Sequence, residues 1–458
     1  MNDMVHITNI KDDQIFQQVN GYADIPVEGT FHMTPQPNRE DHHVVLMLYR
    51  ELNNTMVCAP VVAELKDEKF SAVLPHIPAG GPYRLQANFV PLYNLDWGIR
   101  GEVKFNLGVG DLYVIAGQSN SAGYGKTPAY DPPCAGVHIL RNNRNWRQAA
   151  HPLNECCDSE RPNSEGCVTG NSPWVRFAAT LHRELNYPIG LVQTSLGGSP
   201  IAKWNPKQEG VLYNNMLEAI RDAGGMVAGV LWYQGCTETS ETAPAEEYLT
   251  HFTEMVEALR ADLAAPTLPF FTIQLNKMIG QRDETRRNAW ALVSEAQRKA
   301  AEVIPAVYVV PSYDLSLSDN IHNDSAANAI LGERLAYLAL EEKYHRAYFG
   351  HAPHVKKAVQ LKDGRVCVTF ESVYTFIETH QILPENLEFI FEDEQGACGV
   401  AAYELKENGK QFVLTPSRRL EGKTTVSFSP YNEHYAVPPI ERATGLPILP
   451  FYRVAVEM

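Results

Sequence analysis

The stretch DLYVIAGQSNSAGYG, residues 111–125, ends a run of all-β sequence and begins an alternation of strands and helices. Residues 112–115 are apolar, with β-branched and aromatic side chains, which is the pattern of a strand buried on both faces of a parallel sheet. Small residues follow at once and place Ser119 at the carboxyl end of this strand. Ligands bind at that end in open α/β sheets. Ser119 is therefore a candidate nucleophile if a base lies near it, and a plain Gly-Ser-Asn turn is the alternative interpretation.

After residue 125, short buried runs alternate with stretches that have helical spacing of apolar residues. The expected strands are 189–192, 227–233, 268–275 and 306–310, and the expected helices are 172–185, 211–223, 246–261, 285–302 and 325–340. This alternation predicts an α/β fold with a parallel sheet. A long polar stretch, residues 126–171, begins next to Ser119, and we expect it to overhang the site, because loops of this length are usually functional or mobile.

The regions on either side of the α/β segment have an all-β pattern. Residues 83–89 show period-two alternation, and turn formers separate short runs rich in Val, Phe, Tyr and Leu. The sequence after residue 351 returns to the same pattern, with a hairpin candidate at Asp363-Gly364. The 458 residues are too many for one ordinary domain. We predict an N-terminal β-sandwich domain (1–110), an α/β catalytic domain (111–350) and a C-terminal β domain (351–458).

Composition excludes several classes of partner. The chain is 44% hydrophobic and 20% charged, as in soluble globular proteins. Its net charge of −15 repels polyanions, so nucleic acid is not an expected partner. No apolar run approaches the roughly 20 residues that a membrane-spanning helix needs, and the polar, acidic N-terminus has no signal-peptide pattern. We therefore expect a cytoplasmic protein with no membrane partner.

The eight cysteines are sparse and show no repeated C-x-x-C pair, so a zinc site is not expected. Free thiols in a reducing compartment are the preferred interpretation, with a disulfide in the long polar stretch as the alternative. The cysteines are Cys58, Cys134, Cys156, Cys157, Cys167, Cys236, Cys367 and Cys398.

Other polar or small residues follow the remaining strands. Gly197 and Gly198 come after the second strand, where free backbone N–H groups could approach a ligand. Gln234 follows the third strand and could donate its amide to a developing oxyanion. Asp319 and His322 stand three residues apart in the last loop, and this spacing can set a carboxylate against Nδ1 while Nε2 faces outward. Each taken alone could also be an ordinary turn, cap or solvated loop.

Taken together, these blocks resemble the SGNH hydrolases of the sialate O-acetylesterase type. The resemblance covers most of the chain from residue 81 on, with five blocks in family order. The blocks are 117–120 with Gly123, 196–201 with Trp204, 212–216, 232–235, and 321–322 followed by Gly332, Arg334 and Leu335, with a tail at 445–447 and 450–451. The resemblance implies a flavodoxin-like parallel-sheet core and hydrolysis of acetyl esters through a serine acetyl-enzyme, without a metal or organic cofactor.

The resemblance also implies roles for single residues. Ser119 would attack the acetyl carbonyl, His322 would move its proton, and Asp319 would hold the imidazole, with Asp314 as the alternative acid. The oxyanion would meet the backbone N–H groups of Ser119 and Gly197, or Gly198 beside it, and the side-chain amide of Gln234.

The sequence departs from the family pattern at three positions. Ser121 stands where the family often has Met, Cys236 where it often has Glu, and Asn323 where it often has Pro.

The expected ligand is a small acetylated sugar, with O-acetylated sialic acid as the first candidate. An esterase for acetylated xylan or another polysaccharide is an alternative, and a non-catalytic carbohydrate-binding protein is another. Because sialic acid is an anion, its enzyme should place cations near the site. Arg141, Arg144, Arg147 and Arg161 in the long polar stretch could serve, or could form a solvated face.

Overall fold

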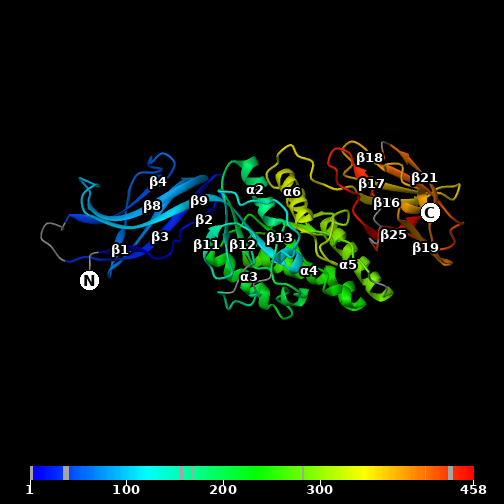
Figure 1. Ribbon diagram of the computed structural model, residues 1–458, viewed down its shortest axis with the longest axis horizontal. Coiled ribbons are helices and arrows are strands. Elements are labelled where there is room, and N and C mark those ends of the chain that lie inside the picture. Colours follow the sequence, from blue (N-terminus) through cyan, green and yellow to red (C-terminus); the bar gives the residue numbers. More distant parts are fainter. Residues whose placement is uncertain are drawn as a thin grey trace.

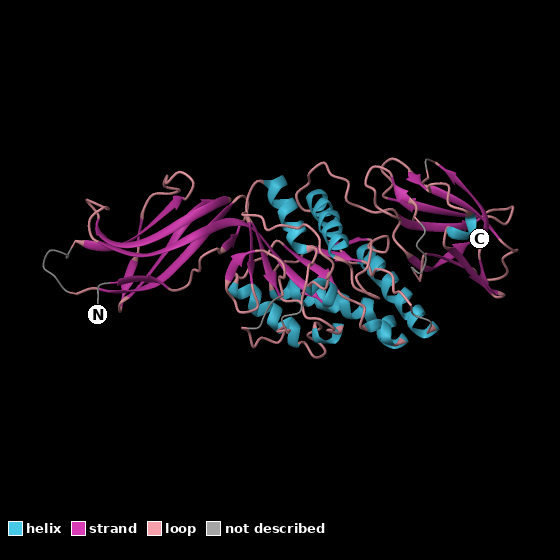
Figure 2. Cartoon of the chain, in the orientation of Figure 1, coloured by secondary structure: helices cyan, strands magenta, loops and turns pink. Residues whose placement is uncertain are grey.

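The computed structural model describes residues 4–34, 41–154, 158–166, 169–280, 283–407, 409–431 and 437–458. The molecule is elongated, with β-sheets at both ends and the helices gathered in the middle (Figure 1). Figure 2 shows this division by secondary structure. In the described ranges, none of the helices is long and apolar enough to cross a lipid bilayer.

The middle of the molecule is built on a parallel sheet whose strands run in the order β12-β9-β13-β14-β15. This is the flavodoxin-like 2-1-3-4-5 order, in which ligands bind where the strand order reverses. β10 adds to the edge parallel to β12, and β11 pairs antiparallel with β10. The strands are β9 (Ile99–Gly117), β10 (Val137–Leu140), β11 (Trp146–Gln148), β12 (Ile189–Gln193), β13 (Gly229–Tyr233), β14 (Phe270–Ile273) and β15 (Val307–Val310).

Five long helices cover the two faces of this sheet. α2 packs against α6, and α4 packs against α5; in Figure 1, α2 and α6 lie on one side of the sheet and α3 and α4 on the other. The helices are α2 (Trp174–Leu185), α3 (Val211–Asp222), α4 (Thr242–Asp262), α5 (Glu284–Val303) and α6 (Ser325–Glu342). The predicted helices and strands of this region are confirmed, and their ends differ by a few residues.

The N-terminal region has two antiparallel sheets around its own apolar core. One sheet has the order β1-β3-β7-β6, and the other contains β4, β5, β8 and the first part of β9. The bounds are β1 (Met4–Ile7), β2 (Ile15–Gln17), β3 (Tyr22–His32), β4 (His42–Arg50), β5 (Val61–Val62), β6 (Glu64–Lys66), β7 (Lys69–Pro78) and β8 (Gly80–Pro91). β9 pairs with β8 through Val109 and with β12 from Asp111 on. The predicted boundary after residue 110 therefore falls inside one continuous strand.

The C-terminal region is one eight-stranded sheet, with a separate pair β18-β24. The two ends of this sheet pack against each other, because the ring centroids of Phe389 in β19 and Phe412 in β22 are 5.6 Å apart. The sheet order is β20-β19-β23-β25-β16-β17-β22-β21. The bounds are β16 (His354–Gln360), β17 (Val366–Glu371), β18 (Ile377–Glu378), β19 (Phe389–Asp393), β20 (Gly396–Cys398), β21 (Val400–Lys406), β22 (Gln411–Pro416), β23 (Thr425–Phe428), β24 (Ile440–Glu441) and β25 (Phe451–Glu457).

Candidate active site

The site lies where β9 and β13 end side by side at the switch in strand order. Ser119 begins the short helix α1 (Ser119–Ala122) directly after β9. Gly117 allows the two strands to come this close, because its φ is +124° and a Cβ there would lie 2.2 Å from the Tyr233 carbonyl oxygen. The Gln118 side chain ties the strand ends together by accepting the Gly235 N–H at 3.0 Å.

Ser119, His322 and Asp319 form a hydrogen-bonded chain. The Ser119 Oγ lies 2.8 Å from His322 Nε2, although the two residues are 203 positions apart. On the other side of the ring, His322 Nδ1 lies 2.7 Å from Asp319 Oδ2. With Nδ1–H donating to the carboxylate, Nε2 is left to accept the serine proton, which is the arrangement that a Ser-His-Asp mechanism needs.

Asp319, rather than Asp314, contacts the imidazole. Burial raises the pKa of Asp319, but hydrogen bonds from the Ile321 and His322 backbones and from the imidazole outweigh it, so the pKa lies below its usual range. The Asp314 carboxylate is instead held by the Arg334 guanidinium, at 2.8 and 2.5 Å. Of the two candidate acids, only Asp319 is placed to orient His322.

Two asparagines fix the loop that carries His322. Asn120, next to the serine, accepts the Asn323 N–H at 3.0 Å and donates to the Ile321 carbonyl at 3.1 Å. Asn323 is fully buried, and its amide donates to the Tyr233 hydroxyl at 3.0 Å. A proline at position 323 would lack both the N–H and the side-chain amide. The departure from the family pattern at this position therefore holds the histidine loop in place.

Ser121 and Cys236, the other two residues that differ from the family pattern, fit their surroundings. The Ser121 hydroxyl lies 2.8 Å from the Ser195 hydroxyl and donates to the Ala116 carbonyl. Cys236 is buried, and burial raises the pKa of its thiol to about 12. The thiol therefore stays protonated and does not act as a nucleophile at neutral pH.

Sequence analysis missed two residues of the site, Tyr124 and Glu165. The Tyr124 ring stacks on the His322 imidazole, with centroids 5.0 Å apart. Its hydroxyl donates to Glu165 Oε1 at 2.9 Å. Burial, reinforced by the Glu165 charge, raises the pKa of Tyr124 to about 12, so the phenol remains a donor. Tyr124 stands close to Ser119 in the sequence and Glu165 lies in the stretch expected to overhang the site, but no local pattern singled either residue out.

The structure corrects the predicted oxyanion donors. The Gly197 N–H donates to Glu165 Oε1 at 2.8 Å. Gln234 is fully buried, and its amide nitrogen donates to the Ser199 carbonyl at 3.2 Å and to Glu238 Oε2 at 2.5 Å. Because a side-chain amide has only two N–H bonds, Gln234 has none left for a ligand.

Two backbone N–H groups of the predicted set, those of Gly198 and Ser119, are not taken up by the described part of the protein. Gly198 is exposed, with a φ of +63°. Across the described ranges, the backbone N–H groups of Gly198 and Ser119 donate to no protein acceptor. Of the predicted set, these two backbone groups are therefore the ones without a protein acceptor in the described ranges.

Two of the four arginines proposed as anion ligands contact carboxylates of α3. Arg144 donates to Asp222 at 2.8 Å and Arg161 donates to Glu218 at 2.8 Å, and both carboxylates belong to α3. Arg147 lies in the edge strand β11. Arg141 follows β10. In the described part of the chain, Arg144 and Arg161 therefore stabilise the α3 side of the core rather than the Ser119–His322 pair.

The described cysteines are free thiols, namely Cys58, Cys134, Cys236, Cys367 and Cys398. The predicted alternative is a disulfide among the cysteines of the long polar stretch. Of these, Cys134 is a free thiol, and Cys156, Cys157 and Cys167 lie outside the described residues. Among the residues that the structure describes, no group of three or more His, Cys, Asp or Glu side chains is placed to hold a metal ion.

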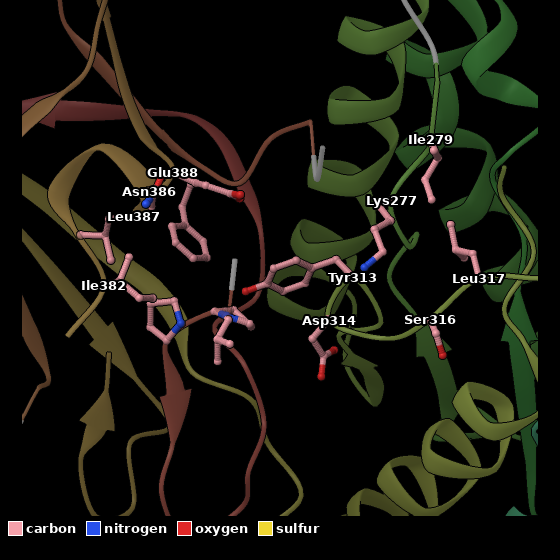
Figure 3. A pocket seen from close by; sticks show the side chains of 14 residues that line it. Lys277, Ile279, Tyr313, Asp314, Ser316, Leu317, Ile382, Asn386, Leu387 and Glu388 are labelled. Atoms are coloured by element: carbon pink, nitrogen blue, oxygen red, sulfur yellow. The ribbon is translucent and has the colours of Figure 1, made fainter. Parts of the chain in front are cut away.

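A cavity of about 350 Å³ lies between the α/β core and the C-terminal sheet. Figure 3 shows Tyr313 and Lys277 reaching into it from the core, opposite Leu387 and Glu388 of the C-terminal region. The cavity adjoins the histidine loop, because Ile279 in its wall donates its N–H to the Asn320 carbonyl at 2.9 Å. Neither Ser119 nor His322 lines it, so it is separate from the reacting serine.

Known proteins resemble this chain in sequence. It is 28% identical to a "probable carbohydrate esterase" of Arabidopsis thaliana over 257 residues, which are 51% of this chain and 92% of that protein. It is 24% identical over 260 residues to the sialate O-acetylesterases of Homo sapiens and Pongo abelii, covering 47% of this chain and 47% of each of them. The chain thus matches less than half the length of those two relatives.

A solved structure and a family model also match the chain. A carbohydrate acetylesterase from Xanthomonas citri shares the fold over 97% of this chain and 99% of its own, with a TM-score of 0.70 and 22% identity. The sequence model of the family described as "carbohydrate esterase, sialic acid-specific acetylesterase" matches residues 109–341, about half of the chain. The matched segment contains Ser119, Asp319 and His322. The chain therefore belongs to this family of carbohydrate esterases.

Proposed function

We propose that the protein is a serine carbohydrate O-acetylesterase in which Ser119 is the nucleophile, His322 the general base and acid, and Asp319 the residue that orients the imidazole. The observation that carries the proposal is the 2.8 Å separation of Ser119 Oγ and His322 Nε2, with Asp319 on the far nitrogen. Placing a nucleophile, base and orienting acid in hydrogen-bond contact is the requirement for activating a serine.

The reaction takes place in two halves. Ser119 Oγ attacks the acetyl carbonyl carbon while His322 Nε2 takes the serine proton, and the tetrahedral intermediate collapses as His322 protonates the departing sugar oxygen. Water then attacks the acetyl-enzyme, with His322 taking its proton and returning it to Ser119 Oγ as acetate leaves. Asp319 accepts Nδ1–H throughout and stabilises the imidazolium that forms in each half.

The oxyanion of each tetrahedral intermediate needs nearby N–H donors. The backbone N–H groups of Ser119 and Gly198 supply them in this proposal, since Gly197 and Gln234 donate to carboxylates of the protein. One donor of this kind typically contributes about 3 kcal/mol of transition-state stabilisation.

Two classes of acetylated sugar are candidate substrates. O-acetylated sialic acid is favoured by the family description and by the two sialate O-acetylesterases that this chain resembles. A neutral acetylated saccharide, such as acetylated xylan, is favoured by the contacts of Arg144 and Arg161, which bind acidic residues of α3.

The first test replaces the nucleophile. Ser119→Ala should lower kcat for a chromogenic acetate ester by roughly 10³-fold or more, because no other group can form the acetyl-enzyme. Ser71→Ala, on an exposed position of β7, is the matched control and should keep the wild-type rate. Thermal unfolding midpoints of both variants should stay near the wild type. Turnover by Ser119→Ala at the wild-type rate would show that the serine is misassigned.

The second test addresses the sugar. Acetate release should be measured from O-acetylated sialic acid and from an acetylated xylo-oligosaccharide at equal concentration of acetyl groups. The ratio of the two kcat/KM values ranks the two candidate classes directly.

A further inference from the structure

The His322 imidazole is held along its edge, at both ring nitrogens. Nδ1 lies 2.7 Å from Asp319 Oδ2 and Nε2 lies 2.8 Å from Ser119 Oγ. Hydrogen bonds of an imidazole nitrogen lie near the ring plane, so these two fix the direction of the ring but oppose its tilting only weakly. The contact with Ser119 is also lost when the serine is acylated. A contact on the ring face, by contrast, can act throughout the reaction.

Water weakens the attraction between Asp319 and a protonated imidazole. The Asp319 side chain is 45% exposed, whereas that of His322 is 16% exposed. An ion pair with one half-exposed partner contributes less than a buried pair of the same geometry, because solvent and salt screen its charge. A second group that stabilises the imidazolium would therefore lower the barrier in each half of the reaction.

Tyr124 makes a contact of this kind with the face of the ring. The Tyr124 and His322 rings are stacked, with centroids 5.0 Å apart and planes at 29° to each other. The face of a phenol ring carries a negative potential, so it attracts a cation more strongly than a neutral group. The stack therefore favours the imidazolium over the neutral imidazole, and only such a difference accelerates the reaction.

The Tyr124 ring is itself held in place from two directions. Its hydroxyl donates to Glu165 Oε1 at 2.9 Å. On the backbone side, the Ser318 hydroxyl lies 3.4 Å from the Tyr124 carbonyl oxygen and 3.3 Å from the His322 carbonyl oxygen. The Ser318 N–H also donates to the His322 carbonyl at 2.8 Å. The segment that carries Tyr124 therefore contacts the loop that carries the histidine, which keeps the two rings together.

We propose that Tyr124 is a positioning residue of the esterase reaction, whose ring stabilises protonated His322 by stacking on the imidazole face. The inference rests on the proposed serine esterase function and deepens it. Three titratable groups face the stack. Asp319 contacts the imidazole and Glu165 contacts the phenol. Lys126 is exposed and lies 5.7 Å from the Tyr124 ring centroid.

The test compares two variants that both lack the phenol hydroxyl. Tyr124→Phe keeps an aromatic ring on the imidazole, whereas Tyr124→Leu replaces it with an aliphatic side chain. Both lose the hydrogen bond to Glu165 and both keep the three titratable groups, so the ratio of their rates isolates the ring. Tyr93→Leu, at a 74% exposed position of the N-terminal region, is the matched control and should keep the wild-type rate.

Tyr124→Leu should have a kcat on a chromogenic acetate ester about fivefold lower than that of Tyr124→Phe. The pH profile of kcat/KM is the second measurement, because its acidic side reports the loss of the neutral base in the free enzyme. Without the ring the imidazolium is less stable, so the pH of half-maximal kcat/KM on the acidic side should fall by about 0.7 of a pH unit from Tyr124→Phe to Tyr124→Leu. Lost packing alone would admit water, which favours the charged imidazole and moves this pH upward.

Equal kcat values for the two variants, or an acidic side that coincides or moves to higher pH in Tyr124→Leu, would overturn the inference. Thermal unfolding midpoints near the wild type establish that both variants fold. If Tyr124→Leu does not fold, Tyr124→Met, with its flexible and adaptable side chain, replaces it in the comparison. Turnover by Ser119→Ala at the wild-type rate would instead overturn the esterase proposal itself, so the two failures are distinguishable.

Discussion

At the scale of single residues, the site depends on which acid contacts His322. Asp319 is exposed and lies on the same loop as the histidine, and three hydrogen bonds draw its carboxylate toward Ile321 and His322. Asp314 stands eight residues before His322, and its carboxylate is held by Arg334. The D-x-x-H spacing favours Asp319, and the hydrogen-bond partners of the two carboxylates decide between them.

Asp319→Asn should impair catalysis, whereas Asp314→Asn should impair stability. Asp319→Asn should lower kcat roughly 10⁴-fold, because an amide cannot stabilise the imidazolium and favours the wrong tautomer. The ordinary pKa of an aspartate is about 4, and that of Asp319 lies below this value, so Asp319 stays ionised from roughly pH 5 to pH 9. The wild type should therefore have a higher kcat than Asp319→Asn throughout this range. Measuring kcat of the wild type and the variant on a chromogenic acetate ester at several pH values tests this.

Asp314→Asn is the control for this comparison. It should lower the free energy of unfolding by about 1 to 3 kcal/mol, since it weakens a charge-assisted contact with Arg334, and it should leave kcat near the wild type. Activity assays beside chemical denaturation separate the two effects. A large loss of kcat in Asp314→Asn with little loss in Asp319→Asn would reverse the assignment.

At the scale of elements, the close approach of β9 and β13 places the serine. Gly117 pairs with Tyr233 in the parallel ladder, and a Cβ at position 117 would clash with the Tyr233 carbonyl oxygen. Gln118 then bridges to Gly235 at the end of β13. A side chain at position 117 would push the two strand ends apart and move Ser119 relative to His322.

Gly117→Ala should lower the free energy of unfolding by roughly 2 to 4 kcal/mol, because the new methyl meets backbone and the positive φ is strained. Gly224→Ala is the control for strain alone: its φ is +113° and a Cβ there meets nothing within 4 Å. It should cost roughly 1 kcal/mol. Denaturant titrations of the two variants measure the difference, and equal losses would show that the clash with Tyr233 is relieved at no cost.

At the scale of the whole molecule, β9 joins the N-terminal sheets to the core. Asp111, buried within this strand, accepts from Gln17 at 2.7 Å and Gln18 at 3.0 Å on the N-terminal side. It also accepts from Tyr187 at 2.8 Å and Tyr344 at 2.7 Å on the core side. One carboxylate therefore connects both regions, and we expect them to unfold together.

Gln17→Ala should lower the midpoint of a single joint unfolding transition. It removes a donor to the buried Asp111 carboxylate and the acceptor of the Leu112 N–H, at a cost of about 2 kcal/mol. Gln148→Ala, in the exposed part of β11, is the control and should change the midpoint little. Calorimetry measures the unfolding midpoint, and limited proteolysis during heating shows whether the N-terminal region and the core become cleavable together. Early melting of the N-terminal region with an unchanged midpoint for the core would show that the two are independent.

Much of this architecture could be predicted from the sequence. The spacing of apolar residues is local information, so the α/β alternation and the elements after residue 125 followed from it. The block of residues around Ser119 and the D-x-x-H spacing identified the three residues that the fold brings into contact. The boundary at residue 110 was placed inside β9, because a composition change does not reveal that one strand continues through two sheets.

The sequence by itself determined the order of strands and helices and the residues able to form a Ser-His-Asp chain, because both depend on side-chain type and short spacing. Only the tertiary structure decided which donors stay open to a ligand. The Gln234 side-chain amide donates to Glu238 and to the Ser199 carbonyl, and the Gly197 N–H donates to Glu165. Such hydrogen bonds form between segments that folding brings together, and in a buried site each polar group takes whichever partner the packing supplies.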